Sequence, residues 1–509
     1  LFAKPDHRGK RETPEAPAFF HDLNLDQVID AITAGWEWKE YNLKPFFYLC
    51  PNDGDTIIYR QEIMQDIESK GLLEPIKSFA QHMRAMRNHL VQAEKLFYGY
   101  RYQKERLFLD AVDIYCSGVR RLLQDLTGAG LQSRGLIAFR GFLRSYVESE
   151  RFASLLAETE QLLAALSEVQ YSLVIKGLRV DVRRYDGEAD YSVEIEKTFA
   201  KFQQGAVEDY GSQFSNAPQN DHVQEQILER LARLYPSMFS ALNHYYSKYA
   251  GFLNETITTF DREVQFYIAY LGYIATFKRA ELKFCYPRVS ADNKEVYSCE
   301  GFDLALANKL VPARLPIVCN DFHLKDGERI FVVTGPNQGG KTTFARAFGQ
   351  LHYLASIGLP VPCREGQFFL FDRLFTHFEK EEDIRDLRGH LEDNLIRIHS
   401  ILEQATPNSI IILNEMFNST TLKDAISLGK KVMEHIIELD ALCVSVTFID
   451  EFASLHPKVV SMVSTVLPED PTAHTFIFER RPADGLAYAI SIAHKYGLTY
   501  QRLKERIQT

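Results

Sequence analysis

The chain has 509 residues, of which 46% are hydrophobic and 25% charged, a composition typical of globular proteins rather than of disordered or membrane-spanning chains. At this length we expect two or more domains. The formal net charge of −10 argues against a surface coated for nucleic acid, because DNA binding depends on Lys and Arg side chains that neutralise phosphates. Any nucleic-acid surface must therefore be local.

The seven cysteines are scattered along the sequence without a C-x-x-C pair. This spacing argues against a disulfide framework and against a zinc site. The first residues, LFAKPDHRGKRETPEA, are polar and do not resemble a signal peptide. We therefore expect a protein of the reducing cytoplasm.

Residues 60–170 have the apolar spacing of helices, with repeats at three and four positions. The pattern then changes to the alternation typical of strands, first at Leu178, Val180 and Val182 and again at Tyr191, Val193 and Ile195. The dipeptide Asp186-Gly187 separates these two runs and predicts the turn of a β-hairpin.

Helical periodicity returns over residues 222–283, with interruptions near Pro236 and Gly251. Two helical segments thus flank a small β element. Two interpretations stay open: an irregular α+β domain, or a pair of long helical arms that carry a β tip.

Short apolar runs separated by helices follow from residue 286 onward. The runs cover residues 330–333, 409–413, 442–448 and 474–478. Continuous apolar strands between helices are typical of a sheet that is at least partly parallel and covered on both faces. We therefore predict an α/β domain over this part of the chain.

The sequence GPNQGGKT at 335–342 has the spacing of a phosphate-binding P-loop between a predicted strand and a predicted helix. Glycines let successive backbone N–H groups surround phosphates, and the start of the helix adds its positive end. We expect Lys341 to contact the β and γ phosphates and the Thr342 hydroxyl to bind Mg²⁺. The predicted nucleotide contacts here are Gly335, Pro336, Asn337, Gln338, Gly339, Gly340, Lys341, Thr342 and Thr343.

A second nucleotide element follows in the apolar run that ends in Asn414 and Glu415. A strand of this kind delivers two polar side chains to the edge of the sheet beside the phosphates. Glu415 is the candidate base for the attacking water, and Thr342, Asn414 and Glu415 are the candidate metal ligands. Asn414 departs from the usual Asp, and a buried strand with a polar end would explain Asn414 better than it explains Glu415.

Several segments together resemble the MutS family of ATPases. They are CNDFHLKDGERIFVVTGPNQGGKTT, SIGLPVP, FDRLFTHFEKEEDI, RGHLEDNLIRIHSILEQA, NEMFNSTTLKDAISL and VTFIDEFASL. The resemblance is strong over residues 317–500 and mainly architectural before them. It implies a P-loop ATPase domain of the ABC/MutS type, preceded by a mostly α-helical core and lever region with a small β clamp element.

The resemblance implies the following division: residues 1–165 form a helical core and outgoing lever, 166–220 a clamp-like β hairpin and loop, 221–285 returning lever helices, and 286–509 the ATPase domain. It also implies a homodimer through the ATPase domains, with ATP and Mg²⁺ as cofactors. Ile317, Asn320 and Gly389 would join the nucleotide contacts.

Four positions depart from the family pattern. Ile317 replaces the aromatic that stacks on adenine, Gly389 the signature serine, Asn414 the acidic residue, and Phe448 the switch histidine. We expect ATP binding to survive these changes and hydrolysis to be slow.

The mismatch-reading domain of the family inserts a Phe-x-Glu wedge into DNA, and none of the 35 Phe residues here precedes a Glu by two positions. We expect that domain and its connector to be lacking, unless they precede Leu1. The candidate function is a dimeric, ATP-dependent DNA clamp in repair or recombination that prefers branched DNA, with Arg179, Arg183 and Arg184 on its hairpin. The alternatives are an ATPase that acts on a ribosome or protein assembly, and a nucleotide-gated scaffold with little hydrolysis.

Overall fold

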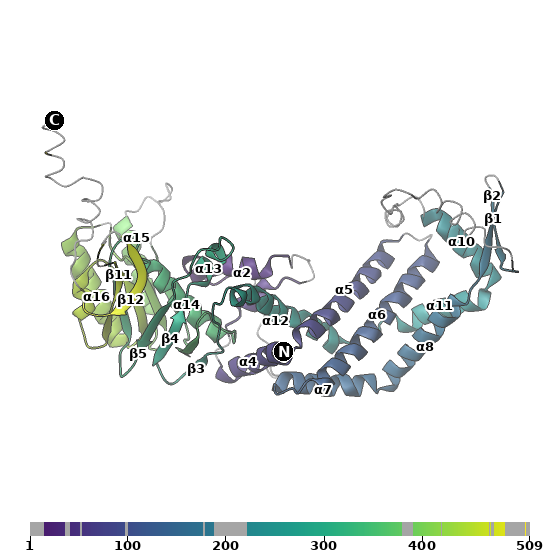
Figure 1. The fold of residues 1–509 in the computed structure, drawn as a ribbon, viewed down its shortest axis with the longest axis horizontal. Helices are drawn as coiled ribbons and strands as arrows, with labels where there is room; N and C mark the ends of the chain where they lie inside the picture. The colour runs from purple at the N-terminus through teal and green to yellow at the C-terminus, as the bar shows by residue number, and fades with distance from the viewer. Residues whose placement is uncertain are drawn as a thin grey trace. The chain divides into compact units, whose positions relative to one another are not determined.

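The computed structural model describes residues 15–35, 41–50, 53–96, 100–176, 179–187, 221–378, 390–418, 420–467, 469, 473–483 and 504. The chain divides into two compact units. The first comprises residues 1–69, 132–135 and 262–509, and the second comprises residues 70–131 and 136–261. Figure 1 shows the elements of both.

The second unit is mainly helical. Its helices are α5 (Leu73–Lys95), α6 (Arg101–Gly128), α7 (Arg134–Val147, from Leu136), α8 (Glu150–Ser167), α10 (Asp221–Leu234), α11 (Pro236–Tyr249) and the start of α12 (Glu255–Arg279). Helices α5 and α6 lie side by side (Figure 1). On α6, buried Phe108, Val112, Tyr115 and Val119 recur at three and four positions, which gives the helix one continuous apolar face.

The helical predictions are confirmed, including both interruptions. Pro236 is the first residue of α11, where its missing N–H is not needed for a helical hydrogen bond. Gly251 lies in the break between α11 and α12.

The β element of this unit differs from the prediction. Strand β2 (Arg179–Arg184) corresponds to the first predicted run, but it pairs antiparallel with the preceding strand β1 (Tyr171–Lys176), which the sequence pattern missed. Gly187 has the expected positive φ of 82°. The second predicted run, at residues 191–195, lies outside the described residues.

The first unit contains a six-stranded sheet in the order β12-β11-β6-β10-β9-β8. The strands are β6 (Ile330–Thr334), β8 (Leu374–His377), β9 (Ile410–Asn414), β10 (Leu442–Val446), β11 (Val459–Val466) and β12 (His474–Arg480). All neighbouring pairs are parallel except β11 with β12. The four predicted strands and the partly parallel sheet are confirmed, whereas β8 and β11 were missed.

Helices cover both faces of this sheet, as predicted. They include α14 (Lys341–Ser356), α15 (His390–Gln404) and α16 (Leu422–Leu439). On β9, Ile411 and Leu413 belong to the apolar cluster with α15 and α16. The intervening Ile412 faces α14, because a Cβ added to Gly349 would lie 2.8 Å from its Cδ1 atom. Alternate residues of one strand therefore serve two apolar layers.

A four-stranded sheet and further helices also belong to the first unit. The sheet has the order β3-β7-β4-β5, with β3 (Arg288–Ser290), β4 (Val296–Gly301), β5 (Asn320–Leu324) and β7 (Glu365–Phe369). The helices are α1 (Phe19–Asp22), α2 (Leu25–Thr33), α3 (Lys44–Tyr48), α4 (Gly54–Ser69), α13 (Leu304–Leu310) and the 3₁₀ helix Asp450–Ser454.

The first helices of the chain belong to the unit that contains the sheet. The Arg346 guanidinium and the Gln350 amide of α14 donate hydrogen bonds of 2.8 and 2.9 Å to the carbonyls of Asp22 and Leu23. The division expected from the sequence assigns these helices to the helical core and outgoing lever of residues 1–165. The division into core, lever, clamp and ATPase domains stays a prediction.

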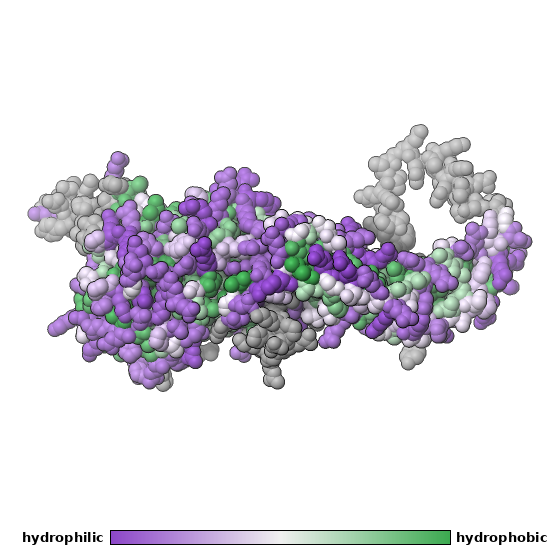
Figure 2. All heavy atoms as spheres, turned by 90° about the horizontal axis from the view of Figure 1, so that it is seen from below, coloured by the Kyte–Doolittle hydropathy of each residue, from purple (hydrophilic) through white to green (hydrophobic). Residues whose placement is uncertain are grey.

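The face in Figure 2 is largely hydrophilic, with small hydrophobic areas scattered among polar ones. Among the described residues, no helix is both long and apolar enough to cross a membrane.

Candidate nucleotide site

The loop between β6 and α14 requires glycine at defined positions. Gly335 and Gly340 have φ values of +126° and +87°, which disfavour residues with a Cβ. A Cβ on Gly335 would also lie 2.8 Å from the Cβ of Ser464 on β11. The buried Ser464 hydroxyl donates a hydrogen bond of 2.7 Å to the Gly339 carbonyl. Strand β11 therefore packs against this loop and holds it through Ser464.

Lys341 is the first residue of α14, and only 4% of its surface is exposed. Its ammonium donates hydrogen bonds of 3.0 and 2.9 Å to the carbonyls of Gly335 and Pro336. Burial lowers the pKa of Lys341, and the Glu415 carboxylate partly offsets this effect. A cation held by neutral carbonyls inside its own loop is poised to accept an anionic partner.

The next residue connects the two motifs. The Thr342 hydroxyl donates a hydrogen bond of 3.0 Å to the side-chain carbonyl of Asn414, the last residue of β9. The start of α14 and the end of β9 thus meet, although 72 positions separate these residues. This contact brings together two of the three predicted metal ligands.

Glu415, the third, follows β9 directly. Its backbone N–H donates to the Val446 carbonyl at 2.9 Å, and its φ of 54° turns the chain out of the sheet. A non-glycine residue in this conformation carries a conformational cost, and such residues cluster at functional sites. Its side chain lines the same cavity as Lys341 and Thr342.

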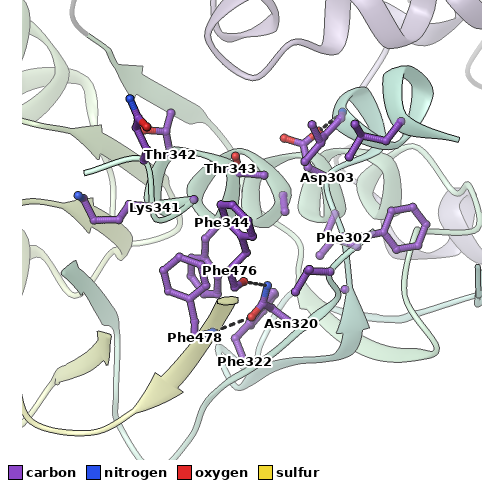
Figure 3. A pocket seen from close by; sticks show the side chains of 18 of the residues that line it. Phe302, Asp303, Asn320, Phe322, Lys341, Thr342, Thr343, Phe344, Phe476 and Phe478 are labelled. Atoms are coloured by element: carbon purple, nitrogen blue, oxygen red, sulfur yellow. Dashed lines mark hydrogen bonds between the residues drawn. The ribbon is translucent and has the colours of Figure 1, made fainter. Parts of the chain in front are cut away.

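This cavity has a volume of about 600 Å³ and combines polar and apolar walls (Figure 3). Among the predicted residues, those that line it are Asn320, Asn337, Gln338, Gly340, Lys341, Thr342, Thr343 and Glu415. The apolar wall includes Phe344 of α14 and Phe476 and Phe478 of β12. A flat, apolar part of a ligand would fit against these rings, and an anionic part against the loop.

Asn320, a predicted nucleotide contact, lies in the wall of the cavity, and its amide is hydrogen-bonded to strand β12 (Figure 3). Its Nδ2 donates to the Phe476 carbonyl at 3.0 Å, and its Oδ1 accepts from the Phe478 N–H at 2.8 Å. Asn320 therefore fixes the strand that carries two aromatic rings.

The remaining predicted residues have different positions. Ile317 is not among the described residues that line the cavity, although its neighbours Pro316 and Val318 are. Gly389 lies outside the described residues. Phe448 follows β10, and 49% of its side chain is exposed.

Sequence reasoning missed Ser464, Phe476 and Phe478. The run VVSMVSTV at 459–466 is a strand signal that could have indicated Ser464. Phe476 and Phe478 belong to a predicted strand, but the sequence does not show that this strand lies beside the P-loop.

These residues fit a nucleoside triphosphate with its magnesium ion. The loop offers backbone N–H groups and the buried Lys341 cation, while Thr342, Asn414 and Glu415 offer the oxygen ligands that Mg²⁺ prefers. Thr342 and Asn414, which contact each other, are both neutral. The carboxylate of Glu415 would therefore supply the negative charge of the metal site.

Residues 331–505 match the family MutS domain V. The chain is 31% identical over 199 residues to the DNA mismatch repair protein MSH3 of Eremothecium gossypii, a segment that covers 37% of this chain and 19% of that protein. It is 29% identical over 195 residues to the DNA mismatch repair protein MutS of Thermosipho melanesiensis, covering 37% and 24%. For MutS of Rickettsia massiliae the identity is 27% over 246 residues, covering 45% and 28%. The matched segments span less than a third of each relative.

Proposed function

We propose, since the chain belongs to the MutS family, that it binds and slowly hydrolyses ATP with Mg²⁺ and uses this cycle to close a homodimeric clamp on DNA. The observation that carries the ATPase proposal is the hydrogen bond of Thr342 to Asn414, because Thr342 lines one cavity together with Lys341 and Glu415. Transfer of a phosphoryl group to water requires a phosphate-binding loop, a cation, a hydroxyl that binds the metal and a carboxylate. The P-loop, Lys341, Thr342 and Glu415 would supply these groups.

Four residues of the chain have distinct roles in the proposed ATP binding and hydrolysis. Lys341 moves its hydrogen bonds from loop carbonyls to phosphate oxygens, and Thr342 orients the metal side of the phosphates. Thr342, Asn414 and Glu415 would hold Mg²⁺, which would neutralise phosphate charge when bound. Glu415 accepts a proton from the attacking water. Asn414 lacks the charge that would strengthen metal binding, which is the reason to expect slow hydrolysis.

Pairing of two ATPase domains completes the proposal. Helix α15 would face the nucleotide of the partner copy, and closure of the pair would be transmitted through rigid helices to the hairpin. ATP would then control when the hairpins hold DNA.

The DNA-binding part of the proposal rests on the hairpin of β1 and β2. Lys176 pairs with Arg179 and Ser172 with Arg183 across the strands, so these cations share one face. Asp181 on the same face forms ion pairs of 2.9 Å with Arg179 and 4.0 Å with Arg183. Three cations against one carboxylate leave a local positive face suited to phosphates.

Arg184 has a different environment. It lies on the opposite face of β2, 5.0 Å from the centre of the Tyr235 ring, and donates to the Leu234 carbonyl. Of the three predicted arginines, Arg179 and Arg183 are therefore the better candidates for DNA.

A binding panel tests this function. It compares matched duplex, G·T mismatch, four-way junction and RNA, at two salt concentrations, with and without ATP. We expect the junction to bind best, the mismatch to bind no better than the matched duplex, and affinity to fall steeply with salt. Replacing Arg179 and Arg183 together by Gln should weaken binding, whereas Arg184→Gln is the matched control with little effect.

Two observations support a second candidate function: the net charge of −10 and the ion pairs of Asp181 both reduce the attraction of the protein to DNA. An ATPase that acts on a ribosome or another protein assembly fits these charges. Failure to bind any DNA in the panel would favour it, and negligible phosphate release would favour a nucleotide-gated scaffold. A clear preference for the mismatch would contradict the proposed preference for branched DNA.

A further inference from the structure

Two cysteines far apart in the sequence meet in the first unit. Cys285 lies between α12 and β3, and Cys363 lies between α14 and β7. Their Sγ atoms are 3.5 Å apart, although the residues are separated by 78 positions. All seven cysteines are free thiols in the structure.

Backbone hydrogen bonds hold the two thiols together. Cys285 and Val361 exchange both hydrogen bonds of an antiparallel pair, at 3.2 and 2.8 Å. The Cys363 N–H donates to the Val361 carbonyl at 2.8 Å, which bends the chain at Pro362 and brings Cys363 back toward Cys285. The main chain therefore holds the two cysteine residues next to each other.

The environments of the two thiols differ in the way that an oxidisable pair requires. Cys285 is partly exposed, whereas Cys363 is buried. The hydrogen bond between the two thiols lowers the pKa of Cys285, although burial opposes this effect, and the same contact raises the pKa of Cys363. By contrast, burial raises the pKa of Cys299 and of Cys319. The accessible thiol of the pair is thus also the better nucleophile.

We propose that Cys285 and Cys363 are a modification site that hydrogen peroxide converts into a disulfide. The Cys285 thiolate attacks one peroxide oxygen, the O–O bond breaks, and the departing hydroxide takes up a proton to leave as water. The Cys363 sulfur then attacks the sulfur of the Cys285 sulfenic acid, the S–O bond breaks, and a second water leaves with the Cys363 proton. Two thiols are oxidised, and one peroxide is reduced to two waters.

The bridge would enclose the nucleotide-binding part of the chain. The loop between the two cysteines contains residues 335–342 and the cavity wall at Phe302. The Phe302 N–H already donates to the Pro362 carbonyl at 3.1 Å, beside Cys363. A disulfide that closes a long loop restricts the unfolded chain and thereby stabilises the folded domain. Oxidation should therefore raise the melting temperature of this unit.

Peptide mapping of the full chain tests the proposal. Folded protein is treated with a small excess of hydrogen peroxide, alkylated, digested without reductant and analysed by mass spectrometry. The expected result is a linked peptide pair containing Cys285 and Cys363, with a melting temperature that rises by several degrees and returns after reduction.

Three variants sharpen the test. Cys299→Ser should oxidise as the wild type does, because Cys299 is the matched neighbouring thiol outside the pair. Cys285→Ser should lose both the bridge and the stabilisation. Cys363→Ser should lose the bridge but accumulate sulfenic acid on Cys285, which a dimedone probe detects. A bridge between Cys363 and Cys299, no linked peptide, or oxidation of Cys285 no faster than that of Cys299 would each overturn the proposal.

Discussion

The Thr342 hydroxyl donates a hydrogen bond of 3.0 Å to the side-chain carbonyl of Asn414, which joins the first turn of α14 to the end of β9. The donor follows the buried Lys341, and the acceptor precedes Glu415, which lines the same cavity. The contact therefore fixes the spacing between the groups that would hold phosphate and the group that would activate water.

Asn414→Asp should increase Mg²⁺-dependent hydrolysis, by about tenfold if the missing charge limits the metal site. The carboxylate would keep the acceptor for Thr342 and add a negative charge beside the metal position. Phosphate release measured over a Mg²⁺ titration is the test, with Asn414→Ala as the control that removes the acceptor. A fall in turnover for the Asp variant would mean that the site is built around the amide.

Glu415→Gln should preserve ATP binding while slowing hydrolysis by about 10²–10⁴-fold, because the water loses its base and the phosphate loop is unchanged. The ATP-bound dimer should then last longer, which light scattering can follow. Exposed Glu438 on α16 provides the control, since Glu438→Gln leaves the cavity unaltered. If wild type and Glu415→Gln show the same monomer–dimer balance under every nucleotide condition, this would argue against the proposal that two ATPase domains pair.

The P-loop strand and the strand ending in Asn414 could be predicted because each combines a local apolar pattern with polar residues at a known offset. The partly parallel sheet also followed, because its central strands are apolar on both faces, as at Ile411 and Ile412. These signals depend on neighbouring residues only.

The features that could not be predicted depend on contacts between distant segments. Ser464 supports the P-loop from a strand more than a hundred positions later, and Asn320 meets β12 at Phe476. Strand β1, which pairs with Val182 of β2, was missed because the Asp-Gly signal lies after β2 whereas β1 precedes it. Local periodicity specifies that a strand exists and not which strand it joins.

Asp440→Asn should lower the stability of the first unit at neutral pH. Asp440 has a φ of 61° at the end of α16, a conformation that Asn tolerates well, so the substitution mainly removes charge. The carboxylate accepts hydrogen bonds from Lys458, Lys294 and Arg329 at 2.7, 3.2 and 3.2 Å. After allowance for solvent screening we expect a loss of about 1 kcal/mol.

The pH dependence of this loss follows from the pKa of Asp440. Partial burial alone would raise it, but the three cations lower it from 3.8 to about 2. The ion pairs therefore stabilise the folded state fully above about pH 4, and this contribution is lost as the pH falls toward 2. Melting temperatures at pH 7 and pH 3 should show a smaller difference between wild type and Asp440→Asn at the lower pH. A difference that grows on acidification would contradict this assignment.

The most direct measurement is calorimetric titration of ATP with Mg²⁺ into the wild type and into Lys341→Ala. Lys341 holds loop carbonyls and does not pack in the apolar core, so the variant should keep its circular dichroism spectrum and its melting temperature within a few degrees. We expect the wild type to bind ATP and the folded variant to show no measurable binding. Unchanged ATP affinity in folded Lys341→Ala would contradict the assignment of this cavity as the nucleotide site.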